Sequence, residues 1–490
     1  MNQEENTENS KKTQKIIIMK QRKKTTSTTS WIPPISLSPI CFFFFFLLPI
    51  VAHGLKDQTS ATMRLELIHR HDPRVFQLHG KKQSALDRFE RVKELAHRDM
   101  VRYARRTNLE TFDMPMHAGR DLGAGVYFVQ VKVGTPFQRF WLIADTGSDL
   151  TWFNCNYKPQ NFTLRRKRRS QSRRRMFSPQ RSRTFQPVTC SSQECKVDLS
   201  HLGSLQACPN TSAPCLYDFR YLDGSGAQGL FGRDTFTVGL TDGRKGKLKD
   251  MVIGCTRSMI EGPTVSKKID GLLGLGLSED TFVAKAASQY GGKFSYCLVD
   301  HLSHKNISNF LTFGSTISKA SLLREIHTTP LVVVSPNYGL NVVGISIGGQ
   351  FLRIPQIVWD FNANGGVILD SGTSLTLLAR PAYLAVIEAL VKPLDLVEKM
   401  KAFDPFEFCY SSKGFDENLV PRLAFHFEGG ARFEPPVKSY VIDVTPEQKC
   451  IGIIGVDSPG PSIIGNIMQQ NHLWEFDLVH KTVQFAPSPC

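Results

Sequence analysis

The sequence predicts an all-β-dominated protein of two homologous lobes. Its 490 residues exceed the size at which one hydrophobic core stops growing, so at least two packed units are expected. A four-residue carboxylate motif occurs twice, at Asp145–Ser148 and Asp370–Thr373, each time directly after an apolar run that is typical of a buried strand. A second matching pair, Leu272–Gly274 and Ile463–Gly465, falls one in each half. This duplication indicates that each lobe contributes one carboxylate motif.

The amino terminus has the features of a targeting segment. A basic flank precedes an apolar block at Ile40–Ala52, which is too short to span a bilayer. We therefore predict a signal peptide over residues 1–54, with Met19 as an alternative start, and a secreted or vacuolar mature protein without a membrane span. A plastid transit peptide, and so a chloroplast location, is the competing interpretation, because residues 9–40 are rich in Ser and Thr and lack acidic residues.

The formal net charge of +16 is concentrated in short segments. Much of the excess lies in residues 1–120, and eight basic residues lie in Arg165–Arg175 alone. The remainder is close to neutral, so composition does not indicate a protein-wide nucleic-acid surface. Because so dense a run of like charge resists packing, we expect an exposed loop at Arg165–Arg175. A processing site, a polyanion-binding patch and a merely solvated loop remain open as its role.

The cysteines favour an exported protein. Cys41 lies in the leader, and the even number that remains suggests five disulfides, whose connectivity the spacing cannot give. The remaining cysteines are Cys155, Cys190, Cys195, Cys208, Cys215, Cys255, Cys297, Cys409, Cys450 and Cys490. No Cys-x2-Cys pair with histidines at ligand spacing occurs, so we expect no metal site. Glycosylation sequons at Asn161, Asn210 and Asn306 agree with passage through the secretory route.

Several further motifs accompany the duplicated carboxylates. They are Tyr127–Val129 followed by Val133–Pro136, Ile253–Cys255, Gly271–Gly276, Phe294–Asp300 and the closing Phe485–Pro487. With these motifs in this order, residues 121–490 resemble the pepsin-like aspartic proteases, and more closely the plant nepenthesin-type branch. The resemblance implies a bilobal pepsin-like fold with the active site in the cleft, and a zymogen of an aspartic endopeptidase that needs no cofactor. It also implies the disulfides Cys155–Cys255, Cys190–Cys215, Cys195–Cys208, Cys297–Cys490 and Cys409–Cys450.

The segment between leader and lobes is expected to be a prosegment, at residues 55–118. Leu65–Arg70 resembles the start of such segments, and a basic amphipathic helix is predicted from Ser84. This helix suits a role in covering an acidic cleft. A solvated helix with no inhibitory role is the alternative, since charge runs usually face water.

The lobes are expected at residues 119–328 and 329–490. The first carries a long insertion at 153–216, in which four cysteines can staple the later half. Helices are predicted at Glu279–Gln289 and at Pro381–Val391, where the proline suits a first helical turn. A monomer is the default expectation.

The two aspartates can support peptide hydrolysis without a metal or a covalent nucleophile. One group must take a proton from water while another polarises the carbonyl. Two close carboxylates share one proton over a wide pH range, so Asp145 and Asp370 are expected to hold a water between them, one ionised and one protonated. By resemblance, hydroxyls after each aspartate cross-link the two turns, and the glycines let backbone amides approach the carboxylates. The expected supporting residues are Thr146, Gly147, Ser148, Ser371, Gly372 and Thr373.

The segment from Tyr221 to Ser225, which includes Gly224, matches the flap hairpin of the family. Tyr221 stands at the position that closes over the substrate, and Trp152 matches the indole that donates to this tyrosine. Both could instead be core aromatics. Leu222 departs from the pattern, because a small glycine commonly follows the flap tyrosine, so flap mobility and subsite shape are in question.

The sequence therefore predicts an endopeptidase that cleaves polypeptides at acidic pH and is controlled by its own prosegment. One alternative is a non-catalytic inhibitor or binding protein, because plant xylanase-inhibitor proteins share the fold while lacking an intact carboxylate pair. The two complete motifs argue against it. Another alternative resembles the DNA-associated aspartic protease of the chloroplast nucleoid, with nucleic acid bound through Arg165–Arg175.

Overall fold

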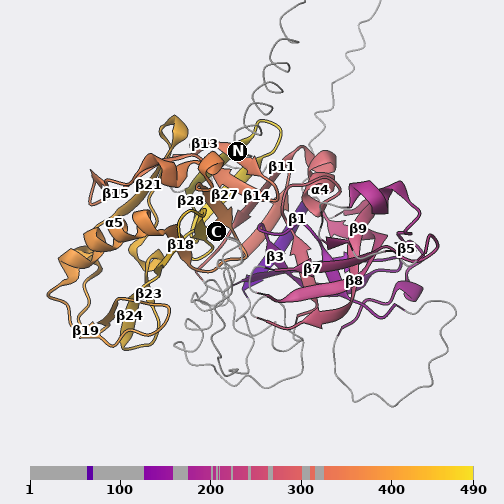
Figure 1. Cartoon of the computed structure of the whole chain (residues 1–490), viewed down its shortest axis with the longest axis horizontal. Helices are drawn as coiled ribbons and strands as arrows, with labels where there is room; N and C mark the ends of the chain where they lie inside the picture. The colour runs from indigo at the N-terminus through magenta and orange to yellow at the C-terminus, as the bar shows by residue number, and fades with distance from the viewer. Residues whose placement is uncertain are drawn as a thin grey trace, which may run out of the picture. The chain divides into compact units, whose positions relative to one another are not determined.

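Strands make up most of the regular structure. The computed structural model describes residues 63–69, 126–157, 175–199, 202, 204–205, 208, 210–221, 224–240, 244–262, 269–300, 309–314 and 325–488, all within one unit, Thr59–Cys490 (Figure 1). The strands of the first half are β1 (Met63–His69), β2 (Tyr127–Val133), β3 (Gln138–Asp145), β4 (Trp152–Asn154), β5 (Gln186–Pro187), β6 (Ser204–Leu205), β7 (Leu216–Arg220), β8 (Gly226–Gly239), β9 (Lys245–Ile260), β10 (Gly271–Gly274), β11 (Lys293–Cys297) and β12 (Asn309–Phe313).

The second half adds further short strands. They are β13 (His327–Val334), β14 (Asn337–Leu340), β15 (Val342–Ile347), β16 (Gln350–Phe351), β17 (Val367–Asp370), β18 (Thr376–Ala379), β19 (Lys399–Met400), β20 (Cys409–Ser411), β21 (Leu423–Phe427), β22 (Arg432–Phe433), β23 (Val441–Asp443), β24 (Gln448–Ile451), β25 (Ile453–Val456), β26 (Ser462–Gly465), β27 (His472–Asp477) and β28 (Thr482–Pro487). Four-stranded sheets form in the orders β16-β15-β21-β22 and β19-β20-β24-β23, and the other strands join one large sheet system.

Helices among the described residues are few. They are α4 (Phe282–Tyr290), α5 (Arg380–Val391), the π-helical turn η2 (Glu194–Asp198) and the 3-10 turns η1 (Pro179–Arg181), η5 (Gln356–Trp359), η6 (Phe361–Ala363), η7 (Lys392–Leu394), η8 (Glu417–Leu419), η9 (Glu428–Gly430) and η10 (Val437–Ser439). Both predicted helices are confirmed. However, α4 begins three residues later than expected, because Asp280 adopts a positive φ of 59° and the side chain of Thr281 caps the helix by accepting the amide of Ala284.

The same strand arrangement surrounds both carboxylate motifs. In the first half β3 runs parallel to β10, which pairs Asp145 with Gly274, and β10 is antiparallel to β4. In the second half β17 runs parallel to β26, which pairs Asp370 with Gly465, and β26 is antiparallel to β18. The duplicated sequence motifs therefore fold into duplicated structure, with each aspartate at the end of a central strand.

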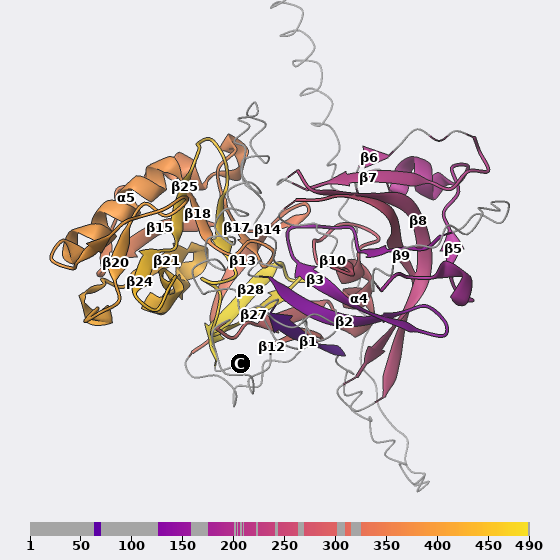
Figure 2. The same cartoon turned by 90° about the horizontal axis from the view of Figure 1, so that it is seen from below.

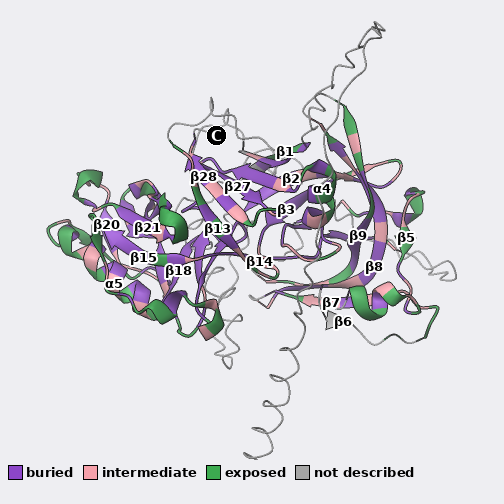
Figure 3. Ribbon diagram, turned by 90° about the horizontal axis from the view of Figure 1, so that it is seen from above, coloured by how far each residue is buried: buried purple, intermediate pink, exposed green. Residues whose placement is uncertain are grey.

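A six-stranded antiparallel sheet joins the two halves, in the order β1-β12-β11-β27-β28-β13. Figure 2 shows β1, β12, β27 and β28 side by side. Aromatic side chains hold its inner face together, since Phe294 of β11 stacks on Phe476 of β27 with ring centroids 4.6 Å apart. Tyr338 of β14 meets Phe476 edge to face at 4.9 Å. Figure 3 shows the central strands β2, β3 and β27 as largely buried.

Strand β1 comes from the expected prosegment. It pairs antiparallel with β12 on one side and with β2 on the other. Met63 and Leu67 are almost completely buried and belong to the same hydrophobic core as β2. The predicted helix from Ser84 lies outside the described residues, so the limits and role of residues 55–118 stay predictions.

Candidate active site

The turn after β3 holds the first carboxylate in a fixed position. Asp145 is fully buried. Its Oδ1 accepts the amide of Gly147 at 2.9 Å, and its Oδ2 accepts the hydroxyl of Ser148 at 2.5 Å. Because a buried carboxylate is costly without hydrogen bonds, these donors explain why the chain tolerates it here.

The turn after β17 repeats this arrangement atom for atom. Asp370 is also fully buried. Its Oδ1 accepts the amide of Gly372 at 2.8 Å, and its Oδ2 accepts the hydroxyl of Thr373 at 2.8 Å. The two motifs thus present their carboxylates through the same local geometry.

The residues that follow the two aspartates bind the turns to each other. Thr146 Oγ1 accepts the amide of Ser371 at 2.9 Å, and Ser371 Oγ accepts the amide of Thr146 at 3.1 Å. Each hydroxyl also donates across the halves, Thr146 to the carbonyl of Leu369 at 3.4 Å and Ser371 to the carbonyl of Ala144 at 3.1 Å. Asp145 and Asp370 therefore sit on two adjacent turns joined by reciprocal hydrogen bonds.

The strands behind the turns explain two glycines of the second duplicated pair. A Cβ on Gly274 would meet the backbone carbonyl of Asp149, and a Cβ on Gly465 would meet that of Leu375. The amide of Leu275 donates to the carbonyl of Asp145 at 2.8 Å, which fastens the first turn to β10. Only glycine permits so close an approach of β10 and β26 to the carboxylate turns.

The expected flap residues lie together. Trp152 Nε1 on β4 donates to the hydroxyl of Tyr221 at 2.6 Å, and both side chains are buried. Beyond β7 the chain turns back where the amide of Tyr221 donates to the carbonyl of Ser225 at 2.9 Å. Gly224 has a φ of 82°, which a residue with a side chain rarely adopts. Leu222 lies outside the described residues, so its effect on the flap stays a prediction.

Two buried polar groups escaped the sequence reasoning. Tyr296 of β11 is buried and donates to Gln469 Oε1 at 2.5 Å. Burial, together with the charge of Asp370, raises the pKa of the Tyr296 hydroxyl well above its usual value. Asp270, immediately before β10, is buried, and burial raises its pKa to about 6 although the amide of Trp141 donates to it. The sequence signal that could have identified them is a polar residue within an apolar motif, for Tyr296, or directly before one, for Asp270.

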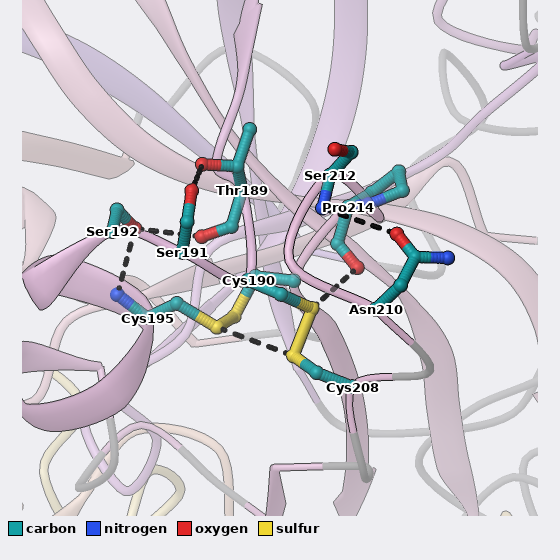
Figure 4. Close-up of a disulfide and its surroundings, with 10 residues drawn as sticks. Thr189, Cys190, Ser191, Ser192, Cys195, Cys208, Asn210, Ser212 and Pro214 are labelled. Atoms are coloured by element: carbon teal, nitrogen blue, oxygen red, sulfur yellow. Dashed lines mark hydrogen bonds between the residues drawn. A yellow bond between two sulfur atoms is a disulfide. The ribbon is translucent and has the colours of Figure 1, made fainter.

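Two of the expected disulfides are wrong. Within the insertion the structure pairs Cys190 with Cys208 (Figure 4) and Cys195 with Cys215, instead of Cys190 with Cys215 and Cys195 with Cys208. The Sγ atoms of Cys195 and Cys208 lie only 4.0 Å apart, so proximity alone does not select the partners. The turn η2 places the buried Cys195 beside the fully buried Cys215, and these two pair. Cys190 therefore pairs with the exposed Cys208.

The other cysteines follow the expected order. Cys155 is joined to Cys255, and Cys409 to Cys450. Cys297 is also disulfide-bonded, and its expected partner Cys490 lies outside the described residues. The sulfurs of Cys190, Cys195 and Cys208 gather within 4.8 Å, but each belongs to a disulfide and offers no thiolate to a metal.

The remaining predicted sites are mostly untested. Asn210 is exposed, and its Oδ1 accepts the amide of Ser212 at 3.1 Å. Asn161, Asn306 and the basic run up to residue 174 lie outside the described residues. In the part of the chain that the structure describes, no helix is long and apolar enough to cross a membrane.

Comparison with known proteins covers both halves. Residues 127–315 match the family described as xylanase inhibitor N-terminal, and residues 337–487 match xylanase inhibitor C-terminal. Aspartyl protease family protein 2 of Arabidopsis thaliana is 33% identical over 385 residues, which are 77% of this chain and 74% of that protein. Aspartic proteinase nepenthesin-1 of Nepenthes gracilis is 30% identical over 451 residues, 88% of this chain and 94% of that one.

Solved structures show the same fold at lower identity. Basic 7S globulin from soybean matches with a TM-score of 0.58 and 19% identity, over 74% of this chain and 93% of that one. The protein named edgp matches with a TM-score of 0.60 and 20% identity, over 75% and 93% of the two chains. Together with the curated relatives, these matches confirm the pepsin-like fold that the duplicated motifs predict. The chain belongs to the pepsin-like aspartic proteases of the peptidase A1 family, in the plant branch that includes the nepenthesins, and is an aspartic-type endopeptidase.

Proposed function

We propose that this protein hydrolyses internal peptide bonds of polypeptides at acidic pH, with Asp145 and Asp370 as the catalytic pair. The observation that carries the proposal is the reciprocal hydrogen bonding of Thr146 and Ser371, which holds two matching carboxylate turns against each other. A single buried aspartate would have a structural explanation. Two buried aspartates with the same donors, on turns bonded to each other, are what a shared-proton mechanism requires.

The chemistry requires two close carboxylates, and the hydrogen bonds that join the two turns support such an arrangement. One carboxylate is ionised and takes a proton from the water held between them, while the protonated partner donates a hydrogen bond to the scissile carbonyl oxygen. The glycine amides and the hydroxyls of Ser148 and Thr373 orient the carboxylates and add no proton acceptor of their own. The reaction needs no metal ion and no covalent intermediate.

The substrate is an extended polypeptide with apolar side chains beside the cleaved bond. Support comes from the sheet that carries the flap, where Phe219 opposes Ala227 and Ala227 opposes Met259 in register. This row of apolar side chains lies beside the buried Tyr221, whose ring is 5.0 Å from that of Phe219. Phe219 and Met259 are only partly buried, so they offer apolar surface to a substrate strand held under the flap.

The protein is made as a zymogen and exported to the cell exterior or the vacuole, and it acts as a monomer. The docking of β1 against β2 and β12 supports a prosegment that folds together with the enzyme. The disulfides support an oxidising compartment. The predicted basic helix from Ser84 would cover the carboxylates until acid weakens the attraction.

The test is cleavage of denatured haemoglobin by the acid-treated full-length protein between about pH 2.5 and pH 8, with and without pepstatin. The proposal expects acid activity that Asp145→Asn and Asp370→Asn each abolish. Thr376→Val serves as a matched control, because it changes a buried threonine of β18 whose hydroxyl has no hydrogen-bond partner. Inactivity at every pH after removal of the prosegment would favour a binding protein on the same fold.

A further inference from the structure

Three of four neighbouring strands of the first half, β2, β3 and β9, carry cations on one face. Arg139 of β3 lies directly opposite Lys132 of β2 in the antiparallel register. The next residue of β2, Val133, pairs with β8, and in β8 the following position, Thr237, lies opposite Lys247 of β9. Val133 is fully buried on the inner face, so Lys132, Thr237 and Lys247 lie on the outer face.

A second line of cations runs along β9. Lys245, Lys247 and Lys249 alternate with residues that point inward, and all three are exposed. Leu248 is fully buried, and a Cβ on Gly246 would meet the hydroxyl of Tyr290 below the sheet. Alternate residues of a strand lie about 7 Å apart, which applies to Lys245 and Lys247. Lys249 lies next along β9, at the irregularity where the register with β8 shifts.

These five residues, Lys132, Arg139, Lys245, Lys247 and Lys249, form a surface that we call the basic face. None of them makes an ion pair with a carboxylate of the described residues. Cations elsewhere do, since Lys293 lies 2.9 Å from Asp477 and Arg233 lies 2.6 Å from Glu194. Like charges on adjacent strands repel one another, so this arrangement is unfavourable unless an anionic partner neutralises it.

An aromatic ring is built into the same surface. Phe137, in the turn between β2 and β3, has the Lys132 ammonium 5.6 Å and the Arg139 guanidinium 5.0 Å from its ring centre. A ring held between two cations offers an apolar platform beside charges. This combination suits a ligand with both flat apolar faces and carboxylates, as a ring of a uronic acid has.

We infer that the basic face binds an extended acidic polysaccharide, a polymer of uronic acids. Four of the five cations are lysines, which act as point charges suited to single carboxylates, whereas phosphate recognition favours the arginine fork. The disulfides agree with the proposed export to an oxidising compartment, where carboxylated polysaccharides occur and nucleic acids are scarce. The attraction of each cation for a carboxylate then adds up along several sugar residues of one polymer chain, which raises the affinity.

The bound polymer leaves the catalytic cleft open. Arg139 is the second residue of β3 and Asp145 ends the strand six residues later, which is about 20 Å along the chain. The basic face therefore anchors the enzyme on a charged matrix while the carboxylate turns remain accessible to substrate. The inference does not depend on the proteolytic mechanism.

The experiment measures binding of the full-length protein to polygalacturonate at pH 6, in low and moderate salt, with neutral dextran as the polymer control. The variant Lys245→Gln/Lys247→Gln/Lys249→Gln is expected to bind at least about tenfold more weakly and to lower the salt dependence by about two to three released counterions. A matched triple, Lys392→Gln/Lys401→Gln/Lys413→Gln, removes the same charge from exposed lysines of the second half that form no ion pair among the described residues, and it is expected to bind as the parent does. Circular-dichroism spectra and urea midpoints that match those of the parent show that both triples are folded, whether or not the protein cleaves haemoglobin.

Four results would overturn the inference. The parent protein could fail to bind the polyuronate even in low salt. Both triples could lose affinity equally, in which case net charge alone acts. Binding could survive the β9 substitutions and disappear on deletion of residues 165–173, which would assign it to the arginine-rich loop. Finally, single-stranded DNA of equal charge could bind more tightly than the polyuronate through the same lysines, which would make the basic face a nucleic-acid surface.

Discussion

The indole hydrogen of Trp152 is donated to the hydroxyl of Tyr221 at 2.6 Å, and this bond ties the flap tyrosine to the strand that follows the first carboxylate turn. Trp152→Phe removes the donor and keeps most of the apolar volume. We expect kcat/KM for a peptide substrate to fall roughly fivefold, since one hydrogen bond to a buried hydroxyl is worth about 1 kcal/mol. Tyr221→Phe should cost the same, and the double variant no more than either one. Additive losses in the double variant would show that the bond is not the shared cause.

The exchange between Thr146 and Ser371 should be measurable as a coupling free energy. Thr146→Val leaves the buried amide of Ser371 without its acceptor, and Ser371→Ala does the same to the amide of Thr146. Each is expected to lower the free energy of unfolding by about 1–3 kcal/mol. A double-mutant cycle by urea denaturation should give a coupling of about 1 kcal/mol or more. Thr376→Val should lose much less, because its hydroxyl makes no hydrogen bond.

Asp270 should favour the folded state at acid pH. Burial raises its pKa to about 6, above the usual value of 3.8, so the native state holds the proton more tightly than the unfolded chain does. Its stabilising contribution is complete below about pH 4 and is lost as pH rises through 6. We expect Asp270→Asn to be more stable than the parent by about 2–3 kcal/mol at pH 7, and equal to it at pH 4. Chemical denaturation at the two pH values measures the difference, and a gain that is equal at both would contradict the assignment.

Asp477 has the opposite pH dependence. Burial would raise its pKa, but hydrogen bonds from the backbone of His480 and from the side chains of Lys293 and His480 outweigh it and lower the pKa to about 2. The resulting stabilisation is present above about pH 4 and is lost as pH falls through 2. Asp477→Asn is expected to destabilise by about 2 kcal/mol at pH 5.

The difference in stability between Asp477→Asn and the parent should disappear near pH 2, as measured by urea denaturation. Asp395→Asn, which breaks the exposed pair with Lys399, is the control and should change stability by well under 1 kcal/mol. If the Asp477 difference stayed constant down to pH 2, its carboxylate would not be the group that titrates.

The disulfides of the insertion can be mapped directly. Non-reducing peptide analysis is expected to find Cys190 joined to Cys208 and Cys195 joined to Cys215. Replacing Cys190 and Cys208 together by serine opens a loop of 18 residues and should cost about 3 kcal/mol of stability. Peptides linked as Cys190–Cys215 would restore the pairing that sequence resemblance implies.

Local sequence signals gave the positions of the carboxylate turns, because each motif encodes its own turn. Gly147 and Gly372 supply amides to the aspartate two residues before them, and this relation needs no information from elsewhere in the chain. The positions of α4 and α5 likewise followed from short-range periodicity and capping. The catalytic role of Asp145 and Asp370 stays a prediction until activity is measured.

Contacts between residues far apart in the chain could not be predicted from the sequence. Nothing in the spacing of the four insertion cysteines distinguishes crossed from nested bridges, because their sulfurs gather within a few ångströms of one another. The hydrogen bond of Tyr296 to Gln469 joins residues 173 positions apart, and only the pairing of β11 with β27 brings them together. The basic face could not be predicted from the sequence either, because its residues come together only when β2, β3, β8 and β9 pair in register.

Strand β1 has a practical consequence for producing this protein. Its side chains Met63 and Leu67 fill the core, and its backbone pairs with both β2 and β12. A recombinant gene that starts at the expected first lobe, near residue 119, would omit this strand and leave unpaired backbone on both neighbours. Open edges of this kind template association between chains, so such a product should accumulate as inclusion bodies. Genes that begin before Met63 should instead yield soluble material on refolding.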